Sequence, residues 1–205
     1  MYSGDDFQNV ENTPTIETDR LILRAFTEED ADDFFLLLKD EEVNTFLPWF
    51  PVKTLEQART YLRENYLDYY KHDSAYRYAV CLKSDNRSIG YVVVSNNDSN
   101  DFGYGLRKEF WHRGIVTEAS MAVVKQLAKA GYAYITATHD VKNSRSGEIM
   151  KKVGMKYRYS YVELWQPKNI LVTFRMYQLN FDGVNERTFT GYWNKYPEHF
   201  IEGNI

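Results

Sequence analysis

The chain has 205 residues, which is enough for one domain with a sizeable core, and its hydrophobic share of 43% is typical of a folded globular protein. A formal net charge of -4 argues against a general nucleic-acid-binding domain, because such domains carry a basic excess. The one cysteine, Cys81, excludes an intrachain disulfide and a cysteine-based metal site, and its apolar surroundings in the sequence predict a buried thiol rather than a nucleophile.

The first half of the chain predicts a mixture of helices and strands. Residues 1–15 show no hydrophobic period, so we expect a loose leader. Thr54 and Gln57 have the spacing of a capping box and predict the start of a helix. The expected elements are a strand at 21–26, a helix from Thr27, a helix from Thr54 to about residue 72, and strands at 76–82, 89–95 and 101–106.

The second half alternates strands with helices. We expect a long helix after residues 111–117 that ends near Gly131, a strand at 133–139, a helix at 144–153, and strands at 155–165 and 170–179. This order predicts one mixed α/β domain over residues 16–182. Residues 183–205 form an aromatic C-terminal extension, and its rings are too apolar for a free tail. We therefore expect these rings to pack on the domain or on a partner subunit: Tyr192, Trp193, Tyr196 and Phe200.

The turn between strand 101–106 and the following helix has the features of a phosphate site. The first turn of a helix presents unpaired backbone N–H groups, and the helix dipole adds partial positive charge. Gly114 permits a close approach of an anion to the backbone, and Arg113 adds a full charge. A glycine at such a junction also occurs as a simple turn, so the pattern by itself leaves both interpretations open.

Three segments carry a resemblance to a known family. Gly103-Tyr104-Gly105-Leu106 and residues 110–119 are similar to the acetyl-CoA pyrophosphate loop of the GNAT acetyltransferase superfamily, in its ribosomal-protein N-acetyltransferase (RimJ/RimL-type) branch. Residues 16–30 resemble the opening of that branch, and residues 143–155 resemble its later pattern of Asn-x-x-Ser followed by Lys-x-Gly-Phe/Met. The matches stand in the expected order across residues 16–180.

The resemblance implies a GNAT-type single domain. Its central sheet would be twisted, mostly antiparallel and of about seven strands, with helices on both faces and a splayed fourth and fifth strand. Acetyl-CoA would be the co-substrate, its pantetheine arm lying between the splayed strands, and no metal is expected. The cofactor-binding residues that the resemblance implies are Gly105, Leu106, Arg107, His112, Arg113, Gly114, Ile115, Val116, Thr117 and Asn143.

Two residues depart from the family's loop pattern. His112 stands where the branch has Gly, and Val116 stands where the wider pattern has Gly or Ala. His112 is either a phosphate contact or an exposed ring. Val116 narrows the loop without removing its backbone donors.

The resemblance also implies catalytic residues, each with a plainer alternative. Asn143 matches an amide that holds the cofactor arm and also has the position of a helix cap. Ser146 matches a hydroxyl that protonates the departing sulfur, and otherwise lies on a helix surface. Asp101 is the expected base, directly or through a water relay, with Glu163 as the other candidate. Either carboxylate is alternatively an ordinary solvated acid.

The function that this resemblance implies is direct transfer of an acetyl group from acetyl-CoA to a primary amine in a ternary complex. The acceptor is a protein N-terminus or a small-molecule amine such as an amino sugar, a polyamine or an antibiotic. The alternative is a catalytically inactive acetyl-CoA-binding regulatory module. The amino terminus lacks the pattern of a signal peptide, so we expect a cytoplasmic protein with no nucleic-acid or membrane partner and with a possible homodimer.

Overall fold

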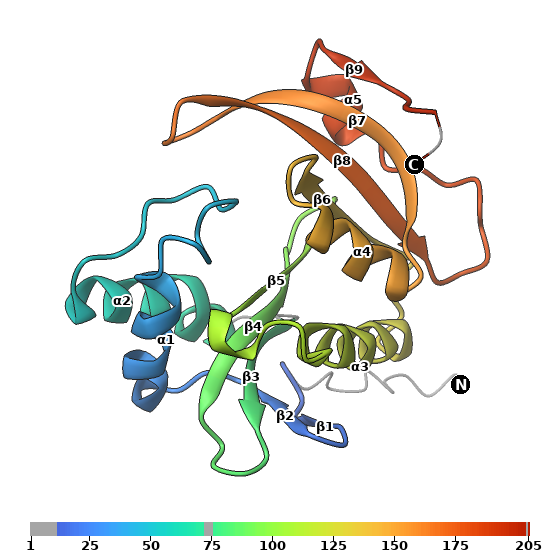
Figure 1. The fold of residues 1–205 in the computed structure, drawn as a ribbon. Helices are drawn as coiled ribbons and strands as arrows, with labels where there is room; N and C mark the ends of the chain where they lie inside the picture. The colour runs from blue at the N-terminus through green and yellow to red at the C-terminus, as the bar shows by residue number, and fades with distance from the viewer. Residues whose placement is uncertain (1–11, 72–75, 204) are drawn as a thin grey trace, which may run out of the picture.

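The computed structural model describes residues 12–71, 76–203 and 205 (Figure 1). The expected leader lies mostly in residues 1–11, outside the described residues, and stays a prediction. The strands are β1 (Ile16–Glu17), β2 (Leu21–Arg24), β3 (Tyr76–Leu82), β4 (Ser88–Val94), β5 (Phe102–Leu106), β6 (Tyr134–Asp140), β7 (Lys156–Trp165), β8 (Ile170–Asn180) and β9 (His199–Phe200). The α-helices are α1 (Ala31–Leu38), α2 (Leu55–Leu62), α3 (Ile115–Lys129), α4 (Ser144–Lys152) and α5 (Gly191–Lys195).

The described strands form two antiparallel sheets. The first has the order β1-β2-β3-β4-β5, and the second has the order β6-β8-β7-β9. They meet where β5 begins: Asp101 and Thr136 form one parallel bridge, and Thr136 N–H donates to Asn100 O at 3.3 Å. Beyond that point β5 and β6 have no paired residues among those described, so the two strands splay apart. The predicted mixed α/β class and the splayed strand pair are confirmed.

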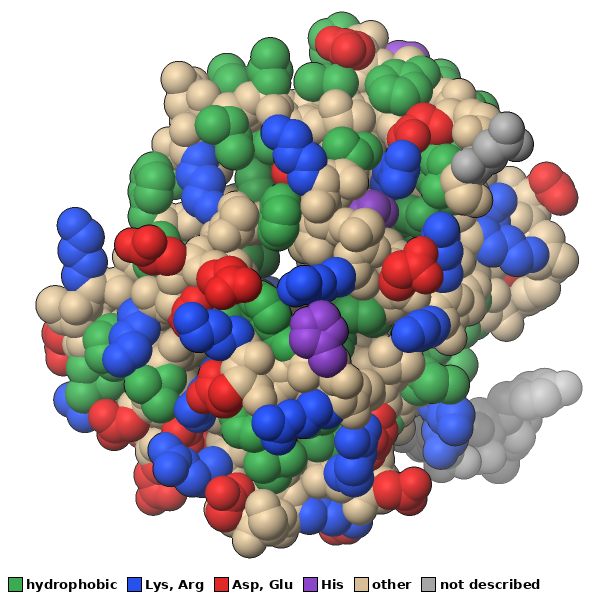
Figure 2. Space-filling model, in the orientation of Figure 1, with side chains coloured by type: hydrophobic (Ala, Val, Ile, Leu, Met, Phe, Trp, Pro, Cys, Tyr) green, Lys and Arg blue, Asp and Glu red, His purple; other side chains and the backbone are tan. Residues whose placement is uncertain are grey.

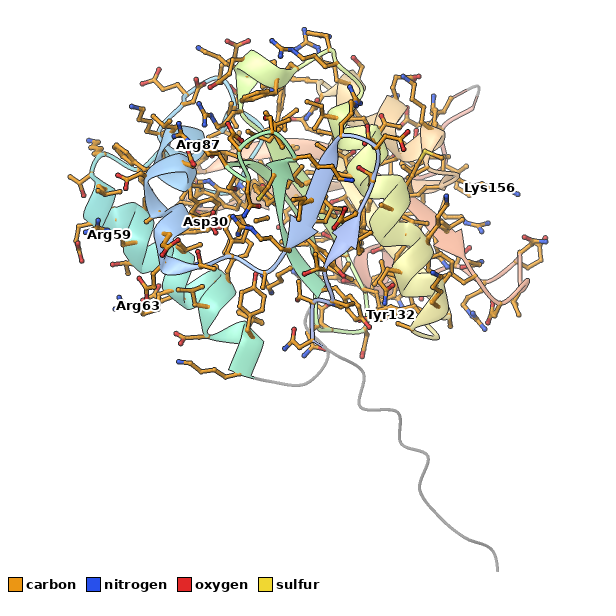
Figure 3. The ribbon with its side chains drawn as sticks, turned by 90° about the horizontal axis from the view of Figure 1, so that it is seen from below. Asp30, Arg59, Arg63, Arg87, Tyr132 and Lys156 are labelled. Carbon is orange, nitrogen blue, oxygen red and sulfur yellow. The ribbon has the colours of Figure 1, made fainter. Side chains whose placement is uncertain are left out.

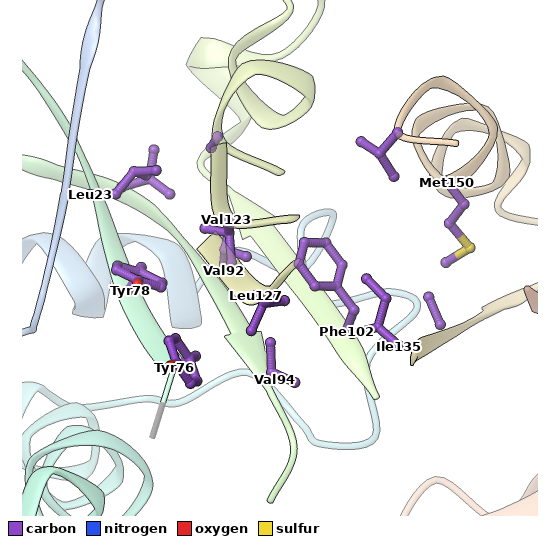
Figure 4. Packing of buried hydrophobic residues seen from close by; sticks show 14 of the residues in the cluster. Leu23, Tyr76, Tyr78, Val92, Val94, Phe102, Val123, Leu127, Ile135 and Met150 are labelled. Atoms are coloured by element: carbon purple, nitrogen blue, oxygen red, sulfur yellow. The ribbon is translucent and has the colours of Figure 1, made fainter. Parts of the chain in front are cut away.

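Helices cover both faces of the first sheet. On one face, Val123 and Leu127 of α3 pack against Val92, Val94 and Phe102 (Figure 4). On the other face, α1 and α2 enclose a second core. Its buried aromatic residues and its cysteine are Phe26, Phe34, Tyr66, Tyr91 and Cys81. Burial raises the pKa of the Cys81 thiol, so the expectation of a buried, protonated thiol is confirmed.

The second predicted helix is less regular than expected. Its capping box is confirmed, because Gln57 N–H donates to Thr54 Oγ1 at 3.2 Å. The α-helix ends at Leu62, however, and continues as a π-helix (Arg63–Leu67) and a 3₁₀ turn (Tyr69–Lys71). The wider π turn places Tyr66 in the second core, 4.6 Å from Phe26 between ring centroids. Tertiary packing thus overrides the local helical pattern.

The C-terminal segment, residues 183–205, is more ordered than its composition indicated. It contains α5 and β9, which lie beside β7 in Figure 1. β9 pairs with β7, with Phe200 opposite Ser160. Elements of five and two residues are too short to produce a hydrophobic period, which is why the sequence did not reveal them. Within the described ranges, no helix combines the length and apolar character needed to cross a bilayer.

Candidate active site

The edge of β5 that faces β6 is open. At the two ends of β5, Arg107 N–H donates to Ile89 O and Asp101 O accepts from Ser95 N–H, each at 2.9 Å, and both bonds point toward β4. Backbone groups of successive residues in a strand point to opposite edges. Odd-numbered residues of this strand therefore face β4, and even-numbered residues turn their N–H and C=O groups toward the gap beside β6.

This alternation separates the three strand residues that were expected to hold the cofactor arm. Leu106 turns its backbone toward the open edge, as does Tyr104. Leu106 O already accepts a hydrogen bond from Trp111 Nε1 at 2.8 Å, which leaves its N–H to bind a ligand. Gly105 and Arg107 direct their backbone groups to β4 instead. Leu106 is thus the residue of the three whose backbone donor fits a bound arm.

The loop after β5 ends in the first turn of α3. Gly114 precedes the helix with a φ of 71°, in the left-handed region that glycine adopts most easily. The first helical bond runs from Glu118 N–H to Gly114 O at 3.0 Å. The N–H groups of Ile115, Val116 and Thr117 precede that bond and have no carbonyl partner within the helix. All three are positioned to bind phosphate oxygens, and the side chain of Val116 does not remove its N–H group.

The charge around this loop suits an anion. His112 and Arg113 are exposed. Figure 2 shows Lys and Arg side chains and one His gathered over the middle of this face, around the connection from β5 to α3. A helix N-terminus combined with basic side chains is a favourable phosphate site. The geometry therefore fits the pyrophosphate of coenzyme A.

Hydrogen bonds from the β1–β2 hairpin hold the loop between β5 and α3 in place. This contact was not predicted from the sequence. Arg20 Nη1 donates to Arg113 O at 2.9 Å, and Arg20 Nε donates to Glu118 Oε2 at 2.7 Å. Thr18 Oγ1 donates to Glu118 Oε1 at 2.6 Å. The segments 16–30 and 110–119 both matched the family pattern, and that joint match was the available signal for their contact.

His112 adopts a φ of 62°, a conformation that costs a non-glycine residue about 1 kcal/mol. Because the imidazole is exposed, we expect His112→Gly and His112→Ala to keep the affinity for acetyl-CoA. We also expect the Gly variant to be more stable than the Ala variant by about 1 kcal/mol, since Ala retains the strain. Calorimetric titration and urea unfolding measure the two quantities. A large loss of affinity in both variants would instead identify the ring as a phosphate contact.

Helix α4 brings Ser146 to the open edge of β5. Asn143 caps this helix, its Oδ1 accepting from Ser146 N–H at 3.3 Å, so the cap interpretation of Asn143 is confirmed. Tyr104, which the sequence did not single out, donates its hydroxyl proton to Ser146 O at 2.8 Å. Its oxygen also lies 2.9 Å from Ser146 Oγ. Burial raises the pKa of Tyr104, so it remains a neutral hydroxyl that orients Ser146.

We expect Tyr104→Phe to lower kcat while leaving the affinity for acetyl-CoA unchanged. The variant loses a hydrogen bond worth about 1 kcal/mol, which corresponds to about a 5-fold slower reaction. Steady-state kinetics and calorimetric titration separate the two quantities. Tyr134→Phe is the matched control, because it also removes a hydroxyl that binds a carbonyl, that of Asp98, at a distance from α4. A wild-type kcat in Tyr104→Phe would contradict the positioning role.

Gly147 lets α4 approach β6 closely. A Cβ atom at this position would lie 2.7 Å from His139 Nε2, too close for any side chain. His139 Nδ1 lies 2.8 Å from Asp140 O, and burial lowers the pKa of the imidazole, which favours its neutral form. His139 and Gly147 together set the height of α4, and hence of Ser146, above β6.

Asp101 lies on the other face of β5. Tyr104 points toward α4, and Asp101, an odd number of positions earlier, points to the face of α1 and α2. Its side chain is half-buried, with Oδ1 3.4 Å from Thr136 Oγ1, and none of the ion pairs among the described residues includes it. Burial raises the pKa of Asp101 to about 7. A carboxylate that titrates near neutrality is suited to accept a proton from an amine.

The other candidate base, Glu163, is already engaged. It lies half-buried on β7, close enough to the Tyr196 hydroxyl and to the charge of Lys195 to interact with both. Those neighbours occupy the side chain and leave it less free to reach an acceptor amine. The geometry therefore favours Asp101 over Glu163.

A separate polar hollow lies beside the start of α1. Figure 3 shows Asp30 and Arg87 next to this helix, and the hollow is lined by further charged side chains from β2 and the β3–β4 turn. Its charges pair with one another, as in the 2.8 Å contact of Arg24 with Asp30 and the ion pair of Arg87 with Asp33. This hollow is a structural ion-pair network. In the parts of the chain that the structure covers, no cluster of three or more His, Cys, Asp or Glu side chains is placed to hold a metal ion.

Comparisons with known proteins agree with this geometry. The acetyltransferase (GNAT) domain family matches residues 20–156. An uncharacterized N-acetyltransferase of Bacillus subtilis (strain 168), YoaA, is 25% identical over 148 residues, which cover 70% of this chain and 83% of that protein.

Two solved structures have a similar fold. The RimL ribosomal L7/L12 α-N-protein acetyltransferase, in complex with coenzyme A, superposes with a TM-score of 0.70 at 20% identity, covering 82% of this chain and 99% of the other. An acetyl transferase from Salmonella typhimurium that modifies the N-terminal serine of ribosomal protein L7/L12 superposes with a TM-score of 0.72 at 18% identity, covering 82% of this chain and 100% of the other.

Proposed function

Because this chain belongs to the GNAT family and is an acyltransferase, we propose that it transfers the acetyl group of acetyl-CoA directly to a primary amine within a ternary complex. The observation that carries this proposal is the open edge of β5. Ser146 lies on one side of that edge, Asp101 lies on the other, and the N-terminus of α3 lies at its end. A donor and an acceptor bound on opposite sides of one strand can react without a covalent enzyme intermediate.

The chain's own groups fit the binding of acetyl-CoA, which supplies an activated acetyl thioester. The backbone N–H of Leu106 would hold the arm at the strand edge. The N–H groups at the start of α3, with Arg113, would bind the pyrophosphate. Asn143 uses its Oδ1 for the helix cap, which leaves Nδ2 to donate a hydrogen bond to the arm.

Asp101 and Ser146 would divide the proton transfers. Asp101 would take a proton from the attacking amine, since its pKa of about 7 leaves it partly ionised at neutral pH. Ser146, held by Tyr104, would give a proton to the departing sulfur. A coenzyme thiol resembles Cys, with a pKa of ~8.5, so this second transfer needs only modest help.

A protein N-terminus fits this site better than a lysine side chain. An α-amine has a pKa of ~7.7–8.0, close to that of Asp101, whereas a lysine amine at ~10.4 is much harder to deprotonate. The structural relatives that act on ribosomal protein L7/L12 support the same class of acceptor. We also propose small-molecule amines with a low pKa as acceptors. We expect the protein to work in the cytoplasm and to form a homodimer.

The test is a calorimetric titration of the intact protein with acetyl-CoA, followed by mass spectrometry of an amine panel. The panel contains peptides with free Ser and Ala N-termini, the same peptides with blocked N-termini and an internal lysine, and small amines. We expect binding, and a mass increase of one acetyl group on the free N-terminal peptides. Binding without any acetylated product would favour the inactive acetyl-CoA-binding module, and no binding would refute the proposal.

A further inference from the structure

The C-terminal segment wraps around β7 and supplies β9, the strand at the edge of the second sheet. On one face of the second sheet, the rings of Tyr192 and Tyr196 stack on Tyr161 at centroid distances of 5.1 and 4.8 Å. After β9 the chain reaches the other face, where Glu202 forms a 2.6 Å ion pair with Arg175. The segment is thus attached to both faces of the sheet, and these contacts hold it in place against β7.

The face that carries Tyr192 is the face of Asp101. Thr136 pairs with Gln178 of β8, and Tyr161 pairs with Phe174 of the same strand. Gln178 and Phe174 are four positions apart. Residues an even number of positions apart on a strand share a face, so Thr136 and Tyr161 do as well. Thr136 Oγ1 is the group that contacts the Asp101 carboxylate. The opposite face holds His139, beneath α4.

A short chain of contacts links Tyr192 to Asp101. The Tyr192 hydroxyl lies close enough to the Ser99 side chain to interact with it. Ser99 O accepts from Thr136 Oγ1 at 2.9 Å, and Thr136 contacts Asp101. Burial and the neighbouring charge of Asp101 both raise the pKa of Tyr192, so the ring lies within electrostatic reach of that carboxylate.

The groups around Asp101 come from four segments, and none of them is a cation in contact with it. Ser95, which follows β4, accepts from the Asp101 N–H at 2.7 Å. The neighbours on the other segments are Thr136 on β6, Tyr161 on β7 and Tyr192 on α5. The Glu163 and Lys195 side chains interact with Tyr196, which stacks on the same Tyr161 ring as Tyr192 does. Tyr192 therefore contributes an aromatic wall where solvent would otherwise reach Asp101.

We propose that Tyr192 is a positioning residue for Asp101, and that the C-terminal segment forms one wall of the acceptor-amine side of the site. The proposal depends on the proposed function for the role of Asp101 as base. Its structural part is independent of that role: the Tyr192 ring keeps water from the carboxylate and holds Ser99 and Thr136 against it. The matched family domain ends at residue 156, so this wall lies outside the part of the chain that the family defines.

The test is a carbon-13 NMR titration of protein labelled at the aspartate side-chain carboxyls, with Asp101→Asn used to identify the Asp101 signal. Wild type should titrate near pH 7 at this position. Tyr192→Ala should lower the midpoint by about one unit or more toward the ordinary ~3.9, because water then solvates the carboxylate. Tyr192→Phe keeps the ring and should retain most of the raised value. Phe200→Ala, which removes an exposed ring of the same segment, should titrate as wild type.

The acidic limb of the kcat/KM profile for an amine acceptor should move together with the NMR midpoint. An Asp101 midpoint in Tyr192→Ala equal to that of wild type would overturn the proposal, even if the variant were less stable. Calorimetric titration with acetyl-CoA is run on the same samples and should show equal affinity in all of them. If wild type itself bound no acetyl-CoA, the proposed function would fail, whereas the NMR comparison would still decide the role of Tyr192.

Discussion

Replacement of Asp101 by Asn should reduce kcat/KM for amine acetylation by about 100- to 10,000-fold, the range over which a general base contributes to a reaction. Affinity for acetyl-CoA should be unchanged, because Asp101 lies on the face of β5 opposite to Ser146. In wild type, kcat/KM should fall as the pH drops below the Asp101 pKa of about 7, since the protonated carboxyl cannot accept a proton. The same pH series on Asp101→Asn should lose the Asp101 contribution and keep only the ionisation of the acceptor amine, which is ~7.7–8.0 for an α-amine.

The protonation of Asp101 can also be followed through the stability of the protein, in the absence of an acceptor amine. An unfolded aspartate ionises near ~3.9, whereas burial keeps Asp101 protonated to about pH 7 in the folded chain. Between these two pH values the folded state binds one proton more than the unfolded state does. The contribution of Asp101 to the free energy of unfolding therefore falls as the pH rises. Asn carries no charge at any pH. Asp101→Asn should therefore gain stability relative to wild type at about pH 8 and much less at about pH 4, as measured by urea unfolding.

Glu163→Gln is the matched control, because it removes the other candidate carboxylate by the same chemical change. We expect nearly wild-type kcat/KM and an unchanged acidic limb, since the Glu163 carboxylate is occupied by its interactions with Tyr196 and Lys195. If Glu163→Gln lost the limb and Asp101→Asn kept it, Glu163 would be the base.

The geometry of the proposed phosphate loop could be predicted from the sequence because it is local. A glycine with positive φ at position 114, followed at once by a helix, fixes three backbone donors within four residues. Such a site depends on neighbouring residues and on little else. The capping box of α2 and the cap of α4 by Asn143 were predictable for the same reason.

The contacts of the proposed catalytic residues could not be predicted, because they depend on how distant segments pack. Tyr104 meets Ser146 across 42 positions of sequence. The choice of Leu106 over its neighbours on β5 depends on which edge of the strand pairs with β4, and the sequence does not specify this register. The residues that flank Asp101 in the sequence do not distinguish it from other acidic residues. Its pKa is raised because the fold buries it. The C-terminal segment, which we propose as one wall of this site, shows no hydrophobic period in the sequence.

The sharpest test of the phosphate loop is Gly114→Glu, which should reduce affinity for acetyl-CoA by about 100-fold or more. The new side chain adds a negative charge at the first turn of α3, where like-charge repulsion of a pyrophosphate costs several kcal/mol. It also introduces a Cβ at a φ of 71°, which costs about 1 kcal/mol of stability. Calorimetric titration measures the first effect, and urea unfolding measures the second.

Gly131→Glu separates these two effects. Gly131 lies at the other end of the same helix with a φ of 83°, and a Cβ there meets no atom of the described residues within 4 Å. The two variants therefore share the substitution, the helix, the net charge and the backbone strain. They differ in whether the carboxylate lies at the N-terminal or the C-terminal end of α3. We expect both variants to lose stability, Gly131→Glu more than Gly114→Glu because its carboxylate lies at the negative end of the helix dipole, with the loss of acetyl-CoA affinity confined to Gly114→Glu. Equal affinities in the two variants would place the coenzyme elsewhere and contradict the site built on β5 and α3.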